Sequence, residues 1–357
     1  MKPGAGVEDR IEARIRRAWD GQPGGALRIA SAAYGVIAGT RNLMYDSGLL
    51  ACRSSPVPVV SVGGLTAGGS GKTPIAADLA CRLGAAGVPT AILAHGFEDE
   101  MDVHRRLAPE ARVYGSRSRV RLARQAAADG AQIIVLDSGF QHRRLHRDLD
   151  VVTLDVASAS SPPAHLPAGP FREGLAALSR ADIVVVVRRT PAGDASGSGM
   201  AEPIPPRLRA FREAPDAPPF VSARIQPGPL VAANMSGGHL DRPHPAVAVA
   251  GVMWPEAFFA QVRNTVASEP ETVSLRDHAR IDASLGDRLR DMAGASGIVC
   301  TLKDSTKLVG VLGESVPIWY LSEKVIWEGQ GSSPIVVRAA LALLDPHTFN
   351  LSEGPVA

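Results

Sequence analysis

Cysteine is scarce in this chain of 357 residues, where only Cys52, Cys81 and Cys300 are present. They lie far apart and form no CxxC pair, so we expect neither a disulfide scaffold nor a cysteine zinc site, which fits a reducing cytoplasm. An excess of charge of either sign is also absent, because 38 basic residues stand against 36 acidic ones. This balance gives no global attraction to nucleic acid, and any binding of anions must come from local basic patches.

Long hydrophobic runs are missing as well. No stretch reaches the ~18 to 20 apolar residues of a membrane-spanning helix, and we expect no secretory signal, because the first residues lack an apolar core. Hydrophobic residues nevertheless make up 45% of the chain and charged residues 21%, which is the composition of a globular protein. The length suits either two ordinary domains or one large α/β domain.

The N-terminal segment combines basic and apolar residues. In residues 8–19, EDRIEARIRRAW, the apolar Ile11, Ile15 and Trp19 fall on one helical face and arginines occupy the other faces. After a Gly/Pro break, residues 27–38 form a second, mainly apolar stretch. Such a pair of helices either lies in a membrane interface or packs on the protein itself, and the pattern alone leaves both interpretations open.

Apolar runs typical of buried strands alternate with helical patterns in the first half of the chain. Strands are expected at residues 59–62, 90–93, 132–136, 151–154 and 183–187, and helices at residues 73–83 and 116–128. Strands of this kind that alternate with helices predict an α/β fold with a mostly parallel sheet covered on both faces.

A stretch rich in Pro, Gly, Ala and Ser, residues 191–218, is the best candidate for a linker. A second α/β unit follows it, with strands expected at residues 247–252, 298–301 and 317–321 and helices at 256–266, 284–293 and 335–344. The predicted divisions are an N-terminal helical segment over residues 1–50, a core over 51–190, the linker over 191–218 and a smaller α/β domain over 219–357.

A phosphate-binding loop is indicated between the first expected strand and helix, where residues 66–74 read TAGGSGKTP. Glycines allow backbone N–H groups to close around phosphate oxygens, and the positive end of the following helix points at the same anion. Lys72 then reaches the β- and γ-phosphates, and the Thr73 hydroxyl binds Mg²⁺. The general GxxxxGK[ST] pattern begins with Gly, whereas this chain has Thr66 there.

The loop predicts a P-loop NTPase-like, three-layer α/β/α core that binds ATP and Mg²⁺. The residues expected to hold the nucleotide are Thr66, Gly68, Gly69, Ser70, Gly71, Lys72 and Thr73.

Several segments, taken in order, resemble the signature motifs of the tetraacyldisaccharide 4'-kinases (lipid A 4'-kinases). The strand and loop VVSVGGLTAGGSGKTP resemble the family's VGNLTxGGTGKTP, in which Thr is the normal residue at position 66. Further similar segments are LDSGFQHRRLHRDLDVVTLD (136–155), LPAGPFREGLAALSRAD (166–182), GVMWPEAFF (251–259), LRDHARI (275–281) and CTLKDSTKL (300–308). The ordered set spans roughly residues 25–345 and is far more specific than the loop alone.

This resemblance implies a two-domain P-loop enzyme that transfers the γ-phosphate of ATP to the 4' hydroxyl of a tetraacylated glucosamine disaccharide 1-phosphate. The family acts at the cytoplasmic face of the bacterial inner membrane, to which an N-terminal helical segment attaches it. The expected partners are therefore the lipid substrate and the membrane surface, with no nucleic acid and no obligate protein partner. The resemblance favours the membrane interpretation of residues 8–45.

The resemblance also assigns roles to single residues. Asp137 matches the first Asp of the family's DDG motif and is expected at the Mg²⁺ with Thr73, together with Glu173 of the PFRE segment. Asp99 matches the family's proposed base for the sugar hydroxyl, and His278 matches the His that pairs with it. A carboxylate held by a His keeps its orientation and accepts a proton in transit.

Other assignments are less specific. Gln141 and His142 are expected near the nucleotide and acceptor pocket, and Arg172 faces either phosphate or solvent. Lys303 and Asp304 fit a nucleotide-side loop contributed by the second domain.

The chain departs from the family's motifs at the metal and acceptor side. Ser138 replaces the second Asp of the DDG pair, which removes one negative charge that would offset Mg²⁺. AHGFE at residues 94–98 replaces SRGYG, Gly64 replaces the usual Asn, and the insert that normally precedes the segment around Asp99 is absent. Either the lipid acceptor differs, or the chain binds or hydrolyses ATP but transfers phosphate poorly.

Two other functions stay open. A P-loop NTPase coupled to a partner protein would carry an N/TKxD motif for guanine, and TLKD at residues 301–304 is close to it, so GTP remains an alternative to ATP. A non-catalytic relative would be expected to have lost Lys72 or Asp99, and both are present.

Overall fold

The computed structural model describes residues 18–19, 23–156, 164–189, 206–235, 244–266, 268–276, 279–329 and 332–344. Most of the amphipathic segment expected at residues 8–19 lies outside these ranges, as do residues 190–205 of the expected linker and His278.

The described strands form one 11-stranded sheet in the order β3-β2-β4-β1-β5-β6-β7-β11-β10-β8-β9. Their bounds are β1 (Val59–Gly64), β2 (Thr90–Ala94), β3 (Arg112–Gly115), β4 (Ile133–Asp137), β5 (Leu149–Asp155), β6 (Ile183–Arg189), β7 (Phe220–Ala232), β8 (Val247–Ala250), β9 (Glu271–Ser274), β10 (Ile298–Cys300) and β11 (Ile318–Glu328). Neighbouring strands are parallel except for the antiparallel pair β7 and β11. The predicted mostly parallel α/β sheet is therefore confirmed.

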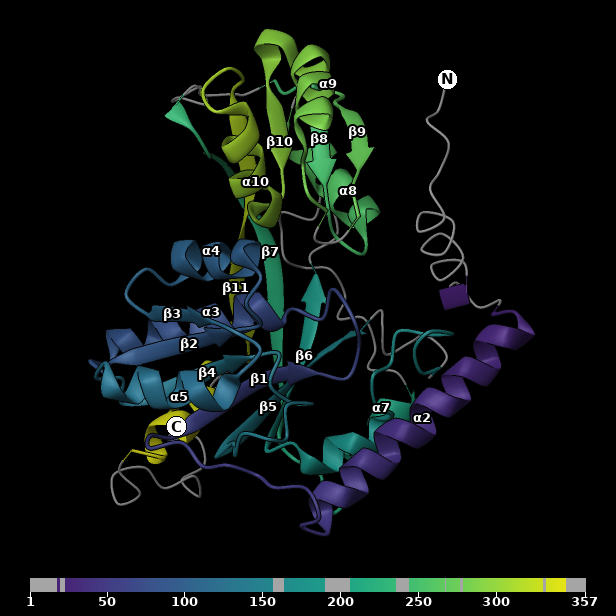
Figure 1. Cartoon of the computed structure of the whole chain (residues 1–357), viewed down its shortest axis with the longest axis vertical. Coiled ribbons are helices and arrows are strands. Elements are labelled where there is room, and N and C mark those ends of the chain that lie inside the picture. The colour runs from purple at the N-terminus through teal and green to yellow at the C-terminus, as the bar shows by residue number, and fades with distance from the viewer. Residues whose placement is uncertain are drawn as a thin grey trace.

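Helices flank this sheet in two lobes (Figure 1). Their bounds are α2 (Gly25–Asp46), α3 (Lys72–Ala85), α4 (Glu98–Leu107), α5 (Arg119–Ala128), η1 (Leu175–Arg180), α7 (Pro206–Arg212), α8 (Pro255–Thr265), α9 (Ala283–Ala293), η3 (Gly294–Ser296), α10 (Leu302–Leu312) and α11 (Ser332–Ala342). We call β1–β6 with α3, α4, α5, η1 and α7 the first lobe, and β8–β10 with α8, α9 and α10 the second lobe.

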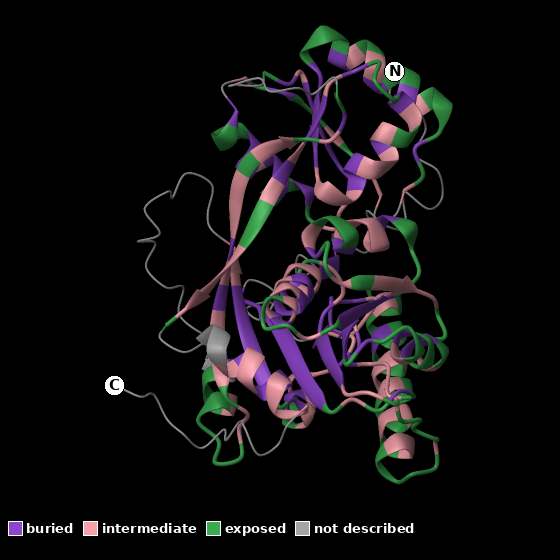
Figure 2. Ribbon diagram, turned by 90° about the vertical axis from the view of Figure 1, so that its left-hand side faces the viewer, coloured by how far each residue is buried: buried purple, intermediate pink, exposed green. Residues whose placement is uncertain are grey.

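The first lobe buries both faces of its strands. Successive side chains of a strand point to opposite faces, so Val60 and Val62 of β1 pack in the core with α3 and α11, while Val59 packs in the core with α5. The second lobe repeats the arrangement, with Val249 of β8 facing α9 and α10, and Ala248 facing α8. Each lobe therefore has three layers, and Figure 2 shows the buried strands inside them.

A long antiparallel ribbon of β7 and β11 joins the lobes (Figure 1). The beginning of β7 pairs with β6, from Phe220 opposite Val184 onward. Its other end pairs with the beginning of β11, with Ala232 opposite Trp319, where β11 also pairs with β10. The sequence pattern predicts only the buried start of β11, because the rest of that strand is half-buried or exposed.

The cores cross the domain boundary expected at residues 191–218. Ala223 and Ile225 of β7 and Val336 of α11 belong to the same buried cluster as Val60 of β1. Leu208 of α7, inside the expected linker, is also buried against the first lobe. The strand β7 and the helix α11, both after residue 218, therefore contribute to the core of the first lobe. The division into domains at residue 218 stays a prediction.

Helix α2 lies along the outside of the first lobe (Figure 1). It is longer than the apolar stretch expected at residues 27–38, and Ser31 is its one buried residue. In the part of the chain that is described, no helix combines the length and apolar character needed to cross a bilayer.

Candidate active site

The connection between β1 and α3 has the backbone of a phosphate cradle. Gly68, Gly69 and Gly71 have φ angles of 71°, 58° and 77°, a left-handed region that glycine adopts without penalty. Gly71 is the N-cap residue of α3, which begins at Lys72. The unpaired N–H groups and the positive end of that helix therefore face the loop, as anion binding requires.

Thr66 stands at the start of the loop where a general P-loop has glycine. Its backbone forms a β-bridge with Phe171, and the neighbouring Leu65 carbonyl accepts a 2.7 Å hydrogen bond from the Arg172 N–H. An extended backbone of this kind suits threonine as well as glycine. Arg172 thus supports the loop through its backbone, and the predicted contact of its side chain with substrate stays a prediction.

Two predicted metal-site residues meet at the end of the loop. The Thr73 hydroxyl donates to Asp137 Oδ2 at 2.9 Å. They are neighbours because β4 lies beside β1, with Val62 opposite Asp137, so the carboxylate stands at the sheet edge from which the loop emerges. Lys72 Nζ lies 2.9 Å from Ser70 Oγ, within the same loop.

The pair has the side-chain types that P-loop proteins use for Mg²⁺, a hydroxyl and a carboxylate, with phosphate oxygens of the nucleotide as further ligands. Among the described residues, no three His, Cys, Asp or Glu side chains form a group that would hold a metal ion. The assignment of Thr73 and Asp137 to Mg²⁺ stays a prediction.

Asp137 is a buried carboxylate that stays ionised. Burial raises its pKa, but the hydrogen bond and charge of His104, the Thr73 hydroxyl and the charge of Lys72 outweigh burial and bring the pKa to about 2. His104 Nε2 lies 2.8 Å from Asp137 Oδ2. The site therefore offers a full negative charge next to the phosphate loop at neutral pH.

Asp99, the expected base, lies in the first turn of α4 and is buried. Its Oδ2 is 2.7 Å from Lys307 Nζ on α10, so this ion pair connects the first lobe to the second. Helix α4 forms although its sequence is very polar. Acidic residues in its first turn and basic residues in its last turn suit the helix dipole, and Arg105 pairs with Glu98 and Asp102.

The structure shows how two residues that depart from the family's motifs are accommodated. A Cβ at Gly64 would lie 2.8 Å from Ser70 Oγ, so a larger residue here requires the Ser70 side chain to move. Ser138 has φ of 57°, a conformation that is uncommon for residues other than glycine. Its hydroxyl lies 3.2 Å from Asp137 Oδ1. Ser138 therefore supplies a hydrogen bond to the remaining carboxylate in place of a second charge.

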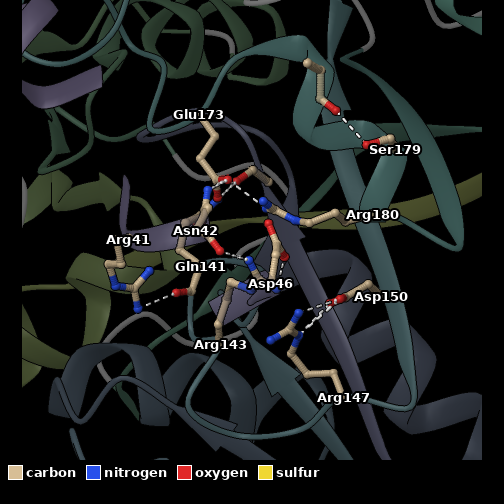
Figure 3. Close-up of polar contacts among 12 residues, drawn as sticks. Arg41, Asn42, Asp46, Gln141, Arg143, Arg147, Asp150, Glu173, Ser179 and Arg180 are labelled. Atoms are coloured by element: carbon tan, nitrogen blue, oxygen red, sulfur yellow. Dashed lines mark hydrogen bonds and ion pairs between the residues drawn. The ribbon is translucent and has the colours of Figure 1, made fainter. Parts of the chain in front are cut away.

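Glu173, the third predicted metal residue, lies in a polar network beside α2 (Figure 3). Its Oε1 accepts from Gln141 Nε2 at 3.0 Å, and its Oε2 accepts from Asn42 at 2.6 Å and Arg180 at 2.7 Å. Gln141 also donates to the Gly64 carbonyl at 3.0 Å, which ties the network to the end of β1. Both carboxylate oxygens therefore have donors within the protein, and a role for Glu173 as a metal ligand stays a prediction.

Asp304 and its neighbours begin a helix. Thr301 is the N-cap residue of α10, and its hydroxyl donates to Asp304 Oδ2 at 2.6 Å. The same oxygen accepts from the Gly251 N–H at 2.7 Å. The TLKD segment thus acts as a helix cap, and the expected nucleotide contacts of Lys303 and Asp304 stay predictions.

The loop before α8 reaches the phosphate loop from the second lobe. A Cβ on Gly68 would lie 2.9 Å from Met253 Cβ, and one on Gly69 would lie 3.3 Å from Trp254 Cδ1. Trp254 also contacts Trp19, with ring centroids 6.0 Å apart. A larger residue at Gly68 would therefore collide with Met253, and one at Gly69 would require Trp254 to shift slightly.

The sequence did not indicate several residues at the site: His104, Lys307, Asn42 and Arg119, whose guanidinium lies 3.4 Å from the Asp137 carbonyl. They reach the site from helices that are distant in the chain. Only the helix that carries His104 could have been predicted from the sequence, because residues 98–107 have an acidic start and a basic end, which are typical of a helix.

These features define a P-loop nucleotide-binding protein of the α/β class. A sequence profile described as tetraacyldisaccharide-1-P 4'-kinase matches residues 25–114 and 99–339. The chain belongs to this family. The two matched segments overlap at residues 99–114.

Two relatives with the name tetraacyldisaccharide 4'-kinase support the same family assignment. The chain is 34% identical over 280 residues to the tetraacyldisaccharide 4'-kinase of Chlorobaculum parvum, covering 71% of this chain and 74% of the relative. It is 31% identical over 344 residues to that of Geobacter sulfurreducens, covering 89% and 92%. A crystal structure of LpxK from Aquifex aeolicus in complex with ATP has the same fold, with a TM-score of 0.63, 24% identity and coverage of 88% and 97%.

The pKa of His142 provides a test of the site's electrostatics. Burial and the nearby Arg119, Arg41 and two further arginines lower this pKa from 6.5 to about 4. Between these values the unfolded chain binds a proton that the folded protein does not, so His142 reduces stability as the pH falls from about 6.5 to about 4. In His142→Gln the melting temperature should fall less than in the parent between pH 7 and pH 5. The exposed His146 provides the control variant His146→Gln, and parallel curves for His142→Gln and the parent would refute the assignment.

The ion pair between Asp99 and Lys307 is expected to stabilise the protein. Lys307→Met removes the positive charge beside the buried Asp99 carboxylate and should lower the free energy of unfolding by about 2 kcal/mol, less than the ~3–5 kcal/mol of fully buried pairs, because the lysine is partly exposed. Asp99→Asn in the same background should recover part of the loss, as a double-mutant cycle in denaturant would measure. Purely additive effects would show that the two charges do not interact.

Proposed function

We propose that this chain transfers the γ-phosphate of ATP to the 4' hydroxyl of a tetraacylated glucosamine disaccharide 1-phosphate, yielding the bis-phosphorylated lipid A precursor. The observation that carries the proposal is the family match, which spans both lobes and includes the phosphate loop, Asp137 and Asp99. The relatives named tetraacyldisaccharide 4'-kinase support the same acceptor.

ATP is the proposed donor. The loop amides and Lys72 would hold its phosphates, and Thr73 and Asp137 would hold the Mg²⁺. When bound, this ion neutralises charge on the phosphates and orients them for in-line attack. The structure of the Aquifex aeolicus protein with ATP supports this choice. GTP is disfavoured as the donor. A guanine-binding motif would use the Asp304 carboxylate of the TLKD segment, and one oxygen of this carboxylate already accepts hydrogen bonds from Thr301 and Gly251.

Asp99 is the proposed general base. As a carboxylate it accepts the proton of the sugar hydroxyl while the oxygen attacks phosphorus. Lys307, 2.7 Å away, keeps it oriented and connects it to the second lobe. His278 is proposed to assist Asp99 through the family resemblance.

Helix α2 is the proposed membrane-facing surface. Five large apolar side chains on it and just after it are 66% to 75% exposed: Ile29, Val36, Ile37, Leu43 and Leu49. Burying such side chains in a lipid interface is favourable. Another side of the helix reaches the site, where Asn42 bonds to Glu173 and Arg41 donates to the Gln141 carbonyl at 3.2 Å. A lipid whose acyl chains stay in the membrane would thus present its sugar beside the phosphate loop, at the cytoplasmic face of the inner membrane.

The kinase proposal is tested with γ-labelled ATP, Mg²⁺ and a tetraacyldisaccharide 1-phosphate in detergent micelles. Lys72→Ala removes the phosphate-binding charge and Asp99→Ala the base, so each should lower the rate of labelling at least about 100-fold. Lys324→Ala, which changes an exposed lysine on β11, should label lipid at the parent rate. Hydrolysis of ATP that depends on Lys72 without any labelled lipid would rule out this acceptor.

The membrane proposal is tested by flotation with vesicles of phosphatidylethanolamine and phosphatidylglycerol. The double variant Val36→Asp/Ile37→Asp places two charges on the exposed apolar face and should reduce the bound fraction about tenfold. Met235→Asp is the matched control, because Met235 is also a large exposed apolar residue, at 88% exposure, but lies away from α2. Equal flotation of all three proteins would show that α2 is not the binding surface.

A further inference from the structure

His104 is a fully buried histidine whose role is not covered by the proposed chemistry. It lies in the last turn of α4, and its Nε2 is 2.8 Å from Asp137 Oδ2. Because an ionised carboxylate only accepts hydrogen bonds, Nε2 carries the proton and donates it to Asp137.

Packing alone does not explain a histidine at this position. Its Nδ1 is buried and has no hydrogen-bond partner among the described residues. A buried polar atom without a partner costs free energy that an apolar side chain of similar size would avoid. The hydrogen bond to Asp137 is therefore the interaction that favours a histidine at this position.

The contact fixes an oxygen that is also bound to the phosphate loop. Asp137 Oδ2 accepts from both His104 and the Thr73 hydroxyl, at 2.8 and 2.9 Å. The other oxygen, Oδ1, lies 3.2 Å from the Ser138 hydroxyl. Donors from α3, α4 and the end of β4 thus determine the plane of the carboxylate.

We propose that His104 is a positioning residue for the Mg²⁺ site, which holds the Asp137 carboxylate in the orientation that the metal requires. This inference rests on the proposed function, because it takes from it the assignment of Asp137 as a Mg²⁺ ligand. It also accounts for the loss of the second Asp at Ser138, since one carboxylate fixed by three donors keeps its geometry without a neighbouring charge. Groups that orient metal ligands typically change metal affinity 10- to 100-fold when they are lost.

The test compares His104→Asn with His104→Gln. The glutamine amide reaches about as far as Nε2 and keeps a donor for Asp137, whereas the shorter asparagine amide reaches only about as far as Nδ1. Both variants place a polar amide in the same buried space, so packing and desolvation are closely matched. Leu107→Ala, on the same helix and partly buried in the core, controls for lost packing in α4.

The measurement is the dissociation constant of Mn²⁺ in the presence of saturating ADP, obtained from the electron paramagnetic resonance signal of free Mn²⁺. His104→Asn should bind Mn²⁺ about tenfold more weakly than the parent, while His104→Gln and Leu107→Ala stay within about threefold. Mn²⁺ affinity of His104→Asn equal to the parent, or an equal loss in Leu107→Ala, would overturn the inference. No lipid takes part in this measurement, so the expected pattern in a protein that phosphorylates no lipid would support the inference while the proposed acceptor fails.

Discussion

The buried negative charge of Asp137 constrains the whole phosphate-binding end of the molecule. A carboxylate removed from water is tolerated only when donors and positive charges surround it. Thr73 from α3, His104 from α4 and the charge of Lys72 provide these, and together they outweigh the effect of burial on its pKa. The same contacts fix α3 and α4 against the edge of the sheet. The geometry that binds phosphate and the stability of this edge therefore depend on one side chain.

The sequence predicted what is local and missed what is assembled across the chain. The phosphate loop is contiguous between a strand and a helix, and Asp137 ends an apolar strand, so both were visible as patterns. His104 meets Asp137 from 33 residues away, and Lys307 meets Asp99 from the other lobe. Neither contact leaves a periodic signal. Helix α4 itself was hidden because it buries only Asp99 and His104, so no apolar stripe marks it.

The division into two units illustrates the same limit. Composition indicated a linker, and a composition change is a fair guide where the chain leaves one core for another. Here the chain returns: β7 pairs with β6 before it reaches the second lobe, and after β11 the helix α11 packs again on the first. The core of the first lobe is thus built from segments on both sides of residue 218, which a change in composition does not indicate. The ribbon of β7 and β11 thus connects the lobes through the backbone hydrogen bonds of one continuous sheet.

The departures from the family's motifs are physically connected with one another. Gly64 leaves space that Ser70 and Thr153 occupy, since a Cβ there would lie 2.8 Å from the Ser70 hydroxyl, and Ser70 in turn lies beside Lys72. Ser138 gives up a charge but directs its hydroxyl at Asp137. With one carboxylate instead of two, the site repels the phosphates of a nucleotide less. If Asp137 holds the metal as proposed, that single carboxylate must be fixed more firmly, and the hydrogen bond from the buried His104 is an interaction of the kind that fixes it.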